Sequence, residues 1–143
     1  MIKLICKIIF VFFIILSVEA KSKEVSIGNV NSKVTIKVFS SLTCPACANF
    51  HSKIFYQIKK EFIDKGLVRF EHHPFPLDLA ALNAEILVRC HVDNIKKFEL
   101  LGKIYEKQKL WAVGSDINKI NDSIKKIGLE SNLKNKDMDD CLK

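Results

Sequence analysis

The chain has 143 residues, of which 48% are hydrophobic and 27% charged, with five cysteines and a formal net charge of +7. This length suits one domain, and no internal repeat or second composition block divides it. The lysines are spread along predicted helix faces without interleaved aromatic side chains. That pattern favours a solvated surface and argues against a nucleic-acid groove.

The first 20 residues have the features of a cleavable signal peptide. Lys3 and Lys7 precede the apolar run 8–16, and Val18-Glu19-Ala20 follows it. A basic start, a short apolar stretch and a small residue before the cut are typical of export signals. The run is shorter than the roughly 20 residues that span a bilayer, so we expect cleavage after Ala20 and no permanent membrane anchor.

Two main strands are predicted before residue 77. The β-branched run 34–39 predicts a strand with one buried face, and residues 67–72 predict a second. The polar lead-in at 21–32 contains a short candidate edge strand at 25–27. Because a helix is expected between the main strands, we predict a parallel βαβ unit and an α/β fold.

The intervening helix is predicted to begin at the turn Cys44-Pro45-Ala46-Cys47. Pro45 is favoured at the first helical position, which makes Cys44 the expected N-cap. Gly66 is suited to end the helix in the left-handed conformation. The apolar face is expected to comprise Cys47, Phe50, Ile54, Ile58 and Phe62.

After Pro74 and Pro76, which are expected to stop the second strand, the pattern is helical. Helices are predicted at residues 78–91, 94–111 and 115–128, followed by a last one within 129–143. Asp78 is the expected N-cap of the first. Two apolar stripes are expected, one of Leu82, Ile86 and Cys90, the other of Ile117, Ile120, Ile124 and Ile127.

Four cysteines remain after the signal segment: Cys44, Cys47, Cys90 and Cys141. Disulfides persist in the oxidising compartments that exported proteins reach, and four cysteines allow three pairings. Because Cys44 and Cys47 at a helix start pair sensibly only with each other, Cys90 and Cys141 are left as the other pair. The alternative is two independent buried thiols.

The spacing of Cys44 and Cys47 indicates thiol–disulfide exchange. A cysteine at a helix N-terminus ionises more readily, and the thiolate is the form that attacks a disulfide. We therefore predict that Cys44 is the nucleophile and Cys47 the resolving thiol. Stabilising the reduced thiolate makes the oxidised form a stronger oxidant, which favours donating disulfides. A structural disulfide and half of a metal site are the alternatives.

Several motifs resemble the DsbA-type thiol:disulfide oxidoreductases, which have a thioredoxin fold, and more narrowly the form common in alphaproteobacteria. They occur in the family's order over almost all of the chain after the signal segment. The motifs are Ser41-Leu42-Thr43-Cys44-Pro45-Ala46-Cys47 with Phe50-His51, Phe75-Pro76-Leu77-Asp78, Ala84 through Arg89-Cys90, Gln108-x-x-Trp111 and Cys141-Leu142.

This resemblance implies that residues 21–77 are the N-terminal part of a thioredoxin-like domain and that residues 78–143 are a helical insertion packed beside Cys44. It implies a periplasmic enzyme without a cofactor that oxidises reduced or unfolded exported proteins. A membrane quinone-linked partner would reoxidise it. A non-catalytic remnant or interaction module of the same fold is the alternative.

The chain departs from the family in two features. The family has a buried acidic residue six positions before the first active-site cysteine, and this chain has Val38 there, with Lys37 expected on the opposite face of the strand. The family also continues into a cis-proline loop, two strands and a helix. We therefore expect a truncated or split member whose C-terminal strands are missing.

Pro45 and His51 are the candidate auxiliary residues of the dithiol, and His72 and His73 are considered only as metal ligands. His51 lies four residues after Cys47 and is expected either to tune the dithiol or to be a partly exposed helix residue. His72 and His73, together with the two cysteines, would supply a two-Cys, two-His metal site, which is the second alternative function. Trp111 is expected to pack in the core or at a helix cap.

Overall fold

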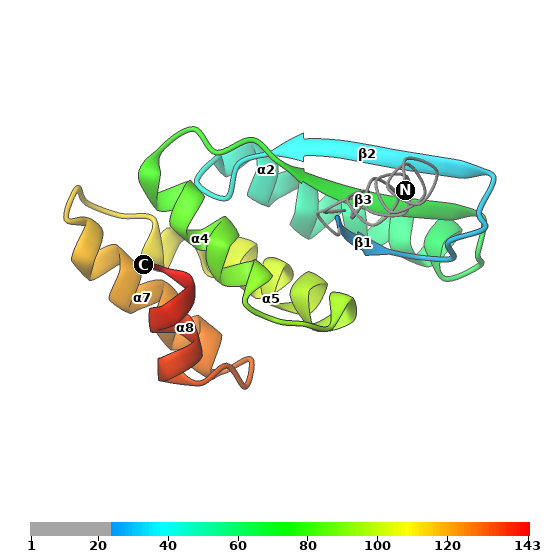
Figure 1. Cartoon of the computed structure of the whole chain (residues 1–143). Helices are drawn as coiled ribbons and strands as arrows, with labels where there is room; N and C mark the ends of the chain where they lie inside the picture. The colour runs from blue at the N-terminus through cyan, green and yellow to red at the C-terminus, as the bar shows by residue number, and fades with distance from the viewer. Residues whose placement is uncertain (1–23) are drawn as a thin grey trace, which may run out of the picture.

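The β-branched and apolar runs of the first half of the chain form one sheet (Figure 1). The computed structural model describes residues 24–143, so the predicted signal peptide lies outside the described residues. The strands are β1 (Val25–Ile27), β2 (Val34–Ser40) and β3 (Val68–Pro74), in the order β1-β3-β2. β3 is parallel to β2 and antiparallel to β1, which confirms the predicted parallel pair.

β3 ends two residues later than the sequence predicts. Pro74 is still in register, opposite Ser40, and the next N–H, of Phe75, donates to the Ser40 carbonyl at 2.9 Å. Proline is tolerated at the end of a strand because only its own N–H is missing from the ladder. The chain leaves the sheet only after Phe75, beside the end of β2.

One continuous helix follows Cys44, but its inward face differs from the prediction. It comprises α2 (Pro45–Asn49), η1 (Phe50–Phe55), α3 (Tyr56–Ile58) and η2 (Lys59–Ile63), and η1 and η2 are π-helical. In π-helical turns the bonds span i→i+5, which moves the inward face along by a residue. Phe55 and Ile63 are therefore buried, whereas Ile54 and Phe62 are exposed.

Gly66 adopts the left-handed conformation after this helix, with φ of 72°, as predicted. After β3 the described chain consists of helices and the short loops that join them. Its helices are α4 (Leu79–Arg89), α5 (Asn94–Glu106), α6 (Gln108–Trp111), α7 (Ile117–Leu129) and α8 (Asn135–Cys141). The predicted helix 94–111 is thus two helices, because the backbone leaves the helical region at Lys107 (φ −93°, ψ 10°).

For α4, the predicted N-cap is confirmed and the predicted apolar stripe is wrong. The Asp78 carboxylate accepts the Ala81 N–H at 2.7 Å, which confirms the N-cap of α4. The stripe expected on α4 is wrong, since Leu82 is 42% exposed. The buried face is instead Ala81, Ala84, Glu85, Leu87 and Val88, which includes a carboxylate.

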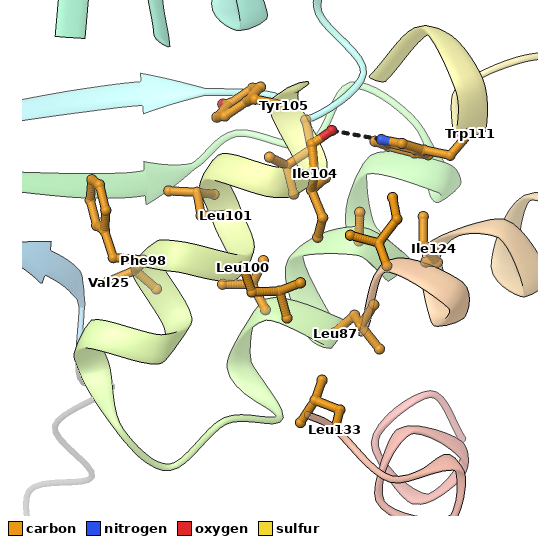
Figure 2. Packing of buried hydrophobic residues seen from close by; sticks show 14 of the residues in the cluster. Val25, Leu87, Phe98, Leu100, Leu101, Ile104, Tyr105, Trp111, Ile124 and Leu133 are labelled. Carbon is orange, nitrogen blue, oxygen red and sulfur yellow. Dashed lines mark hydrogen bonds between the residues drawn. The ribbon is translucent and has the colours of Figure 1, made fainter. Parts of the chain in front are cut away.

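The core lies between the helices and one face of the sheet (Figure 2). α5 contacts β1, the helix after Cys44, α4 and α7, so it joins the sheet to the other helices. Trp111 is 1% exposed and its indole N–H donates to the Ile104 carbonyl at 2.8 Å, which confirms that it packs in the core. One cluster of buried side chains includes residues on both sides of position 77, so the division there stays a prediction.

Cys90 and Cys141 are joined by a disulfide, with their Cα atoms 6.1 Å apart and a sequence separation of 51. It links the end of α4 to the end of α8. Among the described residues, no helix has the length and apolar character needed to cross a bilayer.

Replacing Cys90 and Cys141 together by alanine is expected to lower the free energy of unfolding by about 2–4 kcal/mol, because the cross-link restricts the unfolded chain. Denaturant unfolding of the oxidised chain and of the double variant measures the difference. Equal midpoints would show that this pair adds no stability.

Candidate active site: the dithiol turn

The dithiol lies where β2 leads into α2. Cys44 has extended backbone angles (φ −77°, ψ 117°) and caps the helix, with Pro45 in its first turn. The Cys47 backbone N–H donates to Cys44 Sγ at 3.4 Å. Both thiols are free and half-buried. The sulfur of Cys44 therefore receives hydrogen bonds that favour its anionic form.

The two thiols have opposite electrostatic environments. Hydrogen bonds from the Cys47 thiol and the Cys47 backbone N–H lower the pKa of Cys44 below the ordinary value of 9.0. Burial raises the pKa of Cys47 above that value, and its hydrogen bond to Cys44 adds to the rise. Cys44 is therefore the thiol that ionises first.

Side chains from later in the chain fix the loop that leads into Cys44. The Gln108 amide nitrogen donates to the carbonyls of Leu42 and Cys44, at 2.7 and 3.0 Å. The Thr43 hydroxyl donates to Asp78 at 2.7 Å. Gln108 is the first residue of α6 and is 6% exposed. The helical half of the chain thus positions Cys44.

A buried polar network lies on the sheet face that carries the core. The Tyr105 hydroxyl donates to Ser40 Oγ at 2.9 Å, and Ser40 Oγ is 3.1 Å from His72 Nδ1. His72 Nε2 is 2.5 Å from Glu85 Oε1, and Arg89 donates to the other carboxylate oxygen at 2.5 Å. The side chains of His72 and Glu85 are only 2% and 3% exposed.

His51 is half-buried between aromatic rings. It stacks on Phe55 and Tyr105, with ring centroids 4.7 and 5.0 Å away. Burial, and then the nearby His72, lowers the pKa of His51 to about 4. The ring is therefore neutral at neutral pH, and its Nε2 has no hydrogen-bond partner among the described residues.

The two-Cys, two-His set proposed from the sequence is not brought together. His72 points into the core, where it contacts Ser40 and Glu85. His73, the next residue in β3, points to the other face and stacks on Phe39. Within residues 24–143, no group of three or more His, Cys, Asp or Glu side chains could hold a metal ion.

Val38 is half-buried on the core face of β2, where it lines a cavity of about 10 Å³ together with Cys47 and His72. Lys37 points to the opposite face and lies 3.9 Å from Glu71, as its place in the strand predicts. An apolar side chain thus occupies the position at which the family that the sequence resembles has an acidic residue.

A groove of about 780 Å³ begins beside the turn. It lies between the helix that follows Cys44 and α5, and Pro45, Ala48, Phe55, Tyr105 and Lys109 are among its lining residues. Most of its lining surface is apolar. A chain bound there would lie next to the first turn of the active-site helix.

Sequence reasoning missed Ser40, Glu85 and Tyr105, which take part in the network beneath Cys47. A signal for Glu85 was present, because Ala81, Ala84, Glu85 and Val88 follow the spacing of a buried helix face. A carboxylate on such a face requires partners. No sequence signal pairs Ser40 with Tyr105, which lie 65 residues apart.

Comparisons of the sequence with known proteins point to one family. A sequence-family model described as Thioredoxin matches residues 20–143. A "Putative protein-disulfide oxidoreductase" of Rickettsia bellii is 33% identical over 106 residues, which are 73% of this chain and 40% of the relative. Disulfide bond formation protein D of Bacillus subtilis is 37% identical over 87 residues, which are 57% of this chain and 38% of that protein.

Among solved structures, the crystal structure of Wolbachia pipientis alpha-DsbA1 is similar with a TM-score of 0.78 at 25% identity. The match covers 85% of this chain and 60% of that one. This chain therefore spans less than two thirds of the length of these three proteins.

Proposed function

This chain belongs to the thioredoxin family, among its DsbA-type thiol:disulfide oxidoreductases, and on that premise we propose that it transfers a disulfide from Cys44 and Cys47 to reduced protein substrates. The observation that carries the proposal is the helix-capping position of Cys44. It lowers the pKa of this thiol, while burial raises that of Cys47. In such a dithiol the sulfur with the lower pKa forms the mixed disulfide with a substrate, and the other sulfur can release it.

In the proposed reaction, a substrate thiolate attacks Cys44 Sγ of the oxidised chain. The Cys44–Cys47 bond breaks, its electron pair goes to Cys47, and a mixed disulfide forms. A second substrate thiolate then attacks the substrate sulfur of that bond and releases Cys44 as a thiolate. Two electrons pass from the substrate to the chain, and the low pKa of Cys44 makes it a good leaving group.

Two further residues have auxiliary roles in this proposal. Pro45 fixes the first turn of the helix and leaves no N–H of its own to be satisfied. His51 supports the site as a neutral, stacked ring rather than as a cation. The Cys90–Cys141 disulfide has a structural role at the far ends of α4 and α8.

The setting of the reaction is part of the proposal. We infer that residues 1–20 direct export and are removed, that the chain acts in the periplasm, and that a membrane quinone-linked partner reoxidises it. Residues 21–77 would form the thioredoxin-like part and residues 78–143 the helical insertion. The basic and apolar residues of the first segment support export, and the name of the Bacillus subtilis relative supports the type of reaction.

Mixing the oxidised chain with an equimolar amount of a reduced, unfolded protein tests the proposal. We expect the substrate to gain one disulfide for each Cys44–Cys47 disulfide that is lost, as counted by alkylation and mass spectrometry. A Cys44→Ser variant is the control. Substrate oxidation no faster than with this variant would instead favour a non-catalytic interaction module.

A further inference from the structure

The buried network beneath Cys47 has an order that can move a proton. Tyr105 donates to Ser40, so the Ser40 hydroxyl hydrogen is left to donate to His72 Nδ1. In its neutral form His72 then carries its hydrogen on Nε2, which faces the Glu85 carboxylate at 2.5 Å. Each link is within hydrogen-bond distance, and the chain ends in an ion pair between Glu85 and Arg89.

This network shares a cavity with Cys47, the resolving cysteine of the proposed function. Cys47, Ser40, His72 and Tyr105 line the same cavity of about 10 Å³, which is close to the space that one water molecule needs. Burial raises the pKa of Tyr105. Its hydrogen bond to Ser40 opposes this rise, and the negative charges of Cys47 and Glu85 add to it. The phenol therefore keeps its proton and is coupled to both ends of the network.

Cys47 needs such a path because it is the less exposed thiol, and burial disfavours its thiolate. Of the non-cysteine side chains around the cavity, only those of Ser40, His51, His72 and Tyr105 are polar. The His51 ring is neutral above pH of about 4. Val38 offers no ionisable group. The Ser40–His72–Glu85 chain is therefore the buried group that can supply or accept the proton of Cys47.

We propose that Tyr105, Ser40, His72 and Glu85 form a proton relay that serves Cys47 during disulfide exchange; this inference rests on the proposed function. When a substrate thiolate attacks Cys44, the Cys44–Cys47 bond breaks and Cys47 leaves with the electron pair. For this step His72 starts as the imidazolium. Ser40 passes its hydroxyl hydrogen to the Cys47 thiolate across the shared cavity, the Nδ1 hydrogen of His72 replaces it on Ser40, and His72 is left neutral with its hydrogen on Nε2. In the reverse direction Cys47 gives its proton to the relay, and its thiolate attacks Cys44 of the mixed disulfide.

Glu85 and Arg89 act through His72 rather than on the sulfur, so they are positioning residues. Their role in this relay is to orient the imidazole and to stabilise its protonated form. The charged and titratable groups that face the relay come from four parts of the fold. They are Cys44, Cys47 and His51 around the active-site helix, His72 on β3, Glu85 and Arg89 on α4, and Tyr105 on α5.

The test is the rate at which dithiothreitol reduces the Cys44–Cys47 disulfide at different pH values, referred to the thiolate form of the reductant. Samples are quenched, alkylated and analysed by mass spectrometry, so that the Cys90–Cys141 disulfide is counted separately. The relay predicts that Ser40→Ala slows this reduction by about 100-fold, the lower end for a positioned proton-transfer group. Ser40→Thr keeps the hydroxyl and is expected to restore most of the rate.

The pH profile separates the relay from a merely structural effect. The wild-type rate is expected to fall as the pH rises, because the step consumes a proton, and Ser40→Ala is expected to lose that dependence. Tyr105→Phe should have the same effect as Ser40→Ala, and the double variant should be no slower than either. Glu71→Gln, on the opposite face of β3, should keep the wild-type profile.

A Ser40→Ala rate and profile equal to those of the wild type would overturn the relay. So would a Ser40→Thr variant as slow as Ser40→Ala. Because dithiothreitol replaces the protein substrate, the relay can pass this test even where the chain fails to oxidise a protein. Conversely, unchanged kinetics together with stoichiometric substrate oxidation would refute the relay and leave the proposed function intact.

Discussion

Replacing Cys47 with serine is expected to leave substrate proteins covalently attached to Cys44. The resolving thiol is then absent, so a mixed disulfide that forms at Cys44 cannot be released by attack from within the chain. Incubating the Cys47→Ser variant with a substrate activated as a mixed disulfide should give a covalent complex on most of the chain. Non-reducing electrophoresis and mass spectrometry measure it.

Cys44→Ser is the matched control, since it keeps a thiol in the same turn. Its remaining thiol, Cys47, is less exposed and has a raised pKa. It should give at most a trace of the complex under the same conditions. Equal complex formation by the two variants would refute the division between an attacking and a resolving sulfur.

Replacing Glu85 with alanine is expected to lower the free energy of unfolding by about 3–5 kcal/mol, the usual effect of removing one partner from a buried ionic group. The carboxylate is 3% exposed and contacts both His72 and Arg89. Its removal leaves the buried imidazole Nε2 without its partner. Denaturant unfolding of the oxidised chain measures the change.

Glu99→Ala provides the comparison, because Glu99 is an exposed residue of α5 that makes no ion pair within the described residues. Its effect should stay within about 0.5 kcal/mol. A Glu85→Ala variant as stable as Glu99→Ala would show that the Glu85 carboxylate makes no net contribution to the folded state.

The local elements of the fold could be predicted from the sequence because each depends on nearby residues. Pro45 and Gly66 mark the ends of the helix, and the β-branched run before Cys44 is a strand. The exceptions are also local in origin. The π-helical turns move the buried positions to Phe55 and Ile63, a change that a fixed helical period does not anticipate.

The site could be predicted only in part. The dithiol can be recognised in the sequence because its two cysteines are close together. The helix start that lowers the pKa of Cys44 can be predicted from the same residues. The polar network is not visible, because it joins Ser40, His72, Glu85 and Tyr105 from four separate elements. Such a network depends on how the elements pack against one another, and no periodic pattern in a single sequence indicates that packing.

The central claim is that Cys44 is the sulfur that attacks and Cys47 the one that resolves. The most direct measurement is the initial rate of iodoacetamide modification of each thiol in the reduced chain, read by mass spectrometry as a function of pH. Cys44 should react faster than Cys47 throughout the range below pH 9.0, because its pKa lies below that value and that of Cys47 lies above it. Faster modification of Cys47, or equal rates for the two thiols, would contradict the claim.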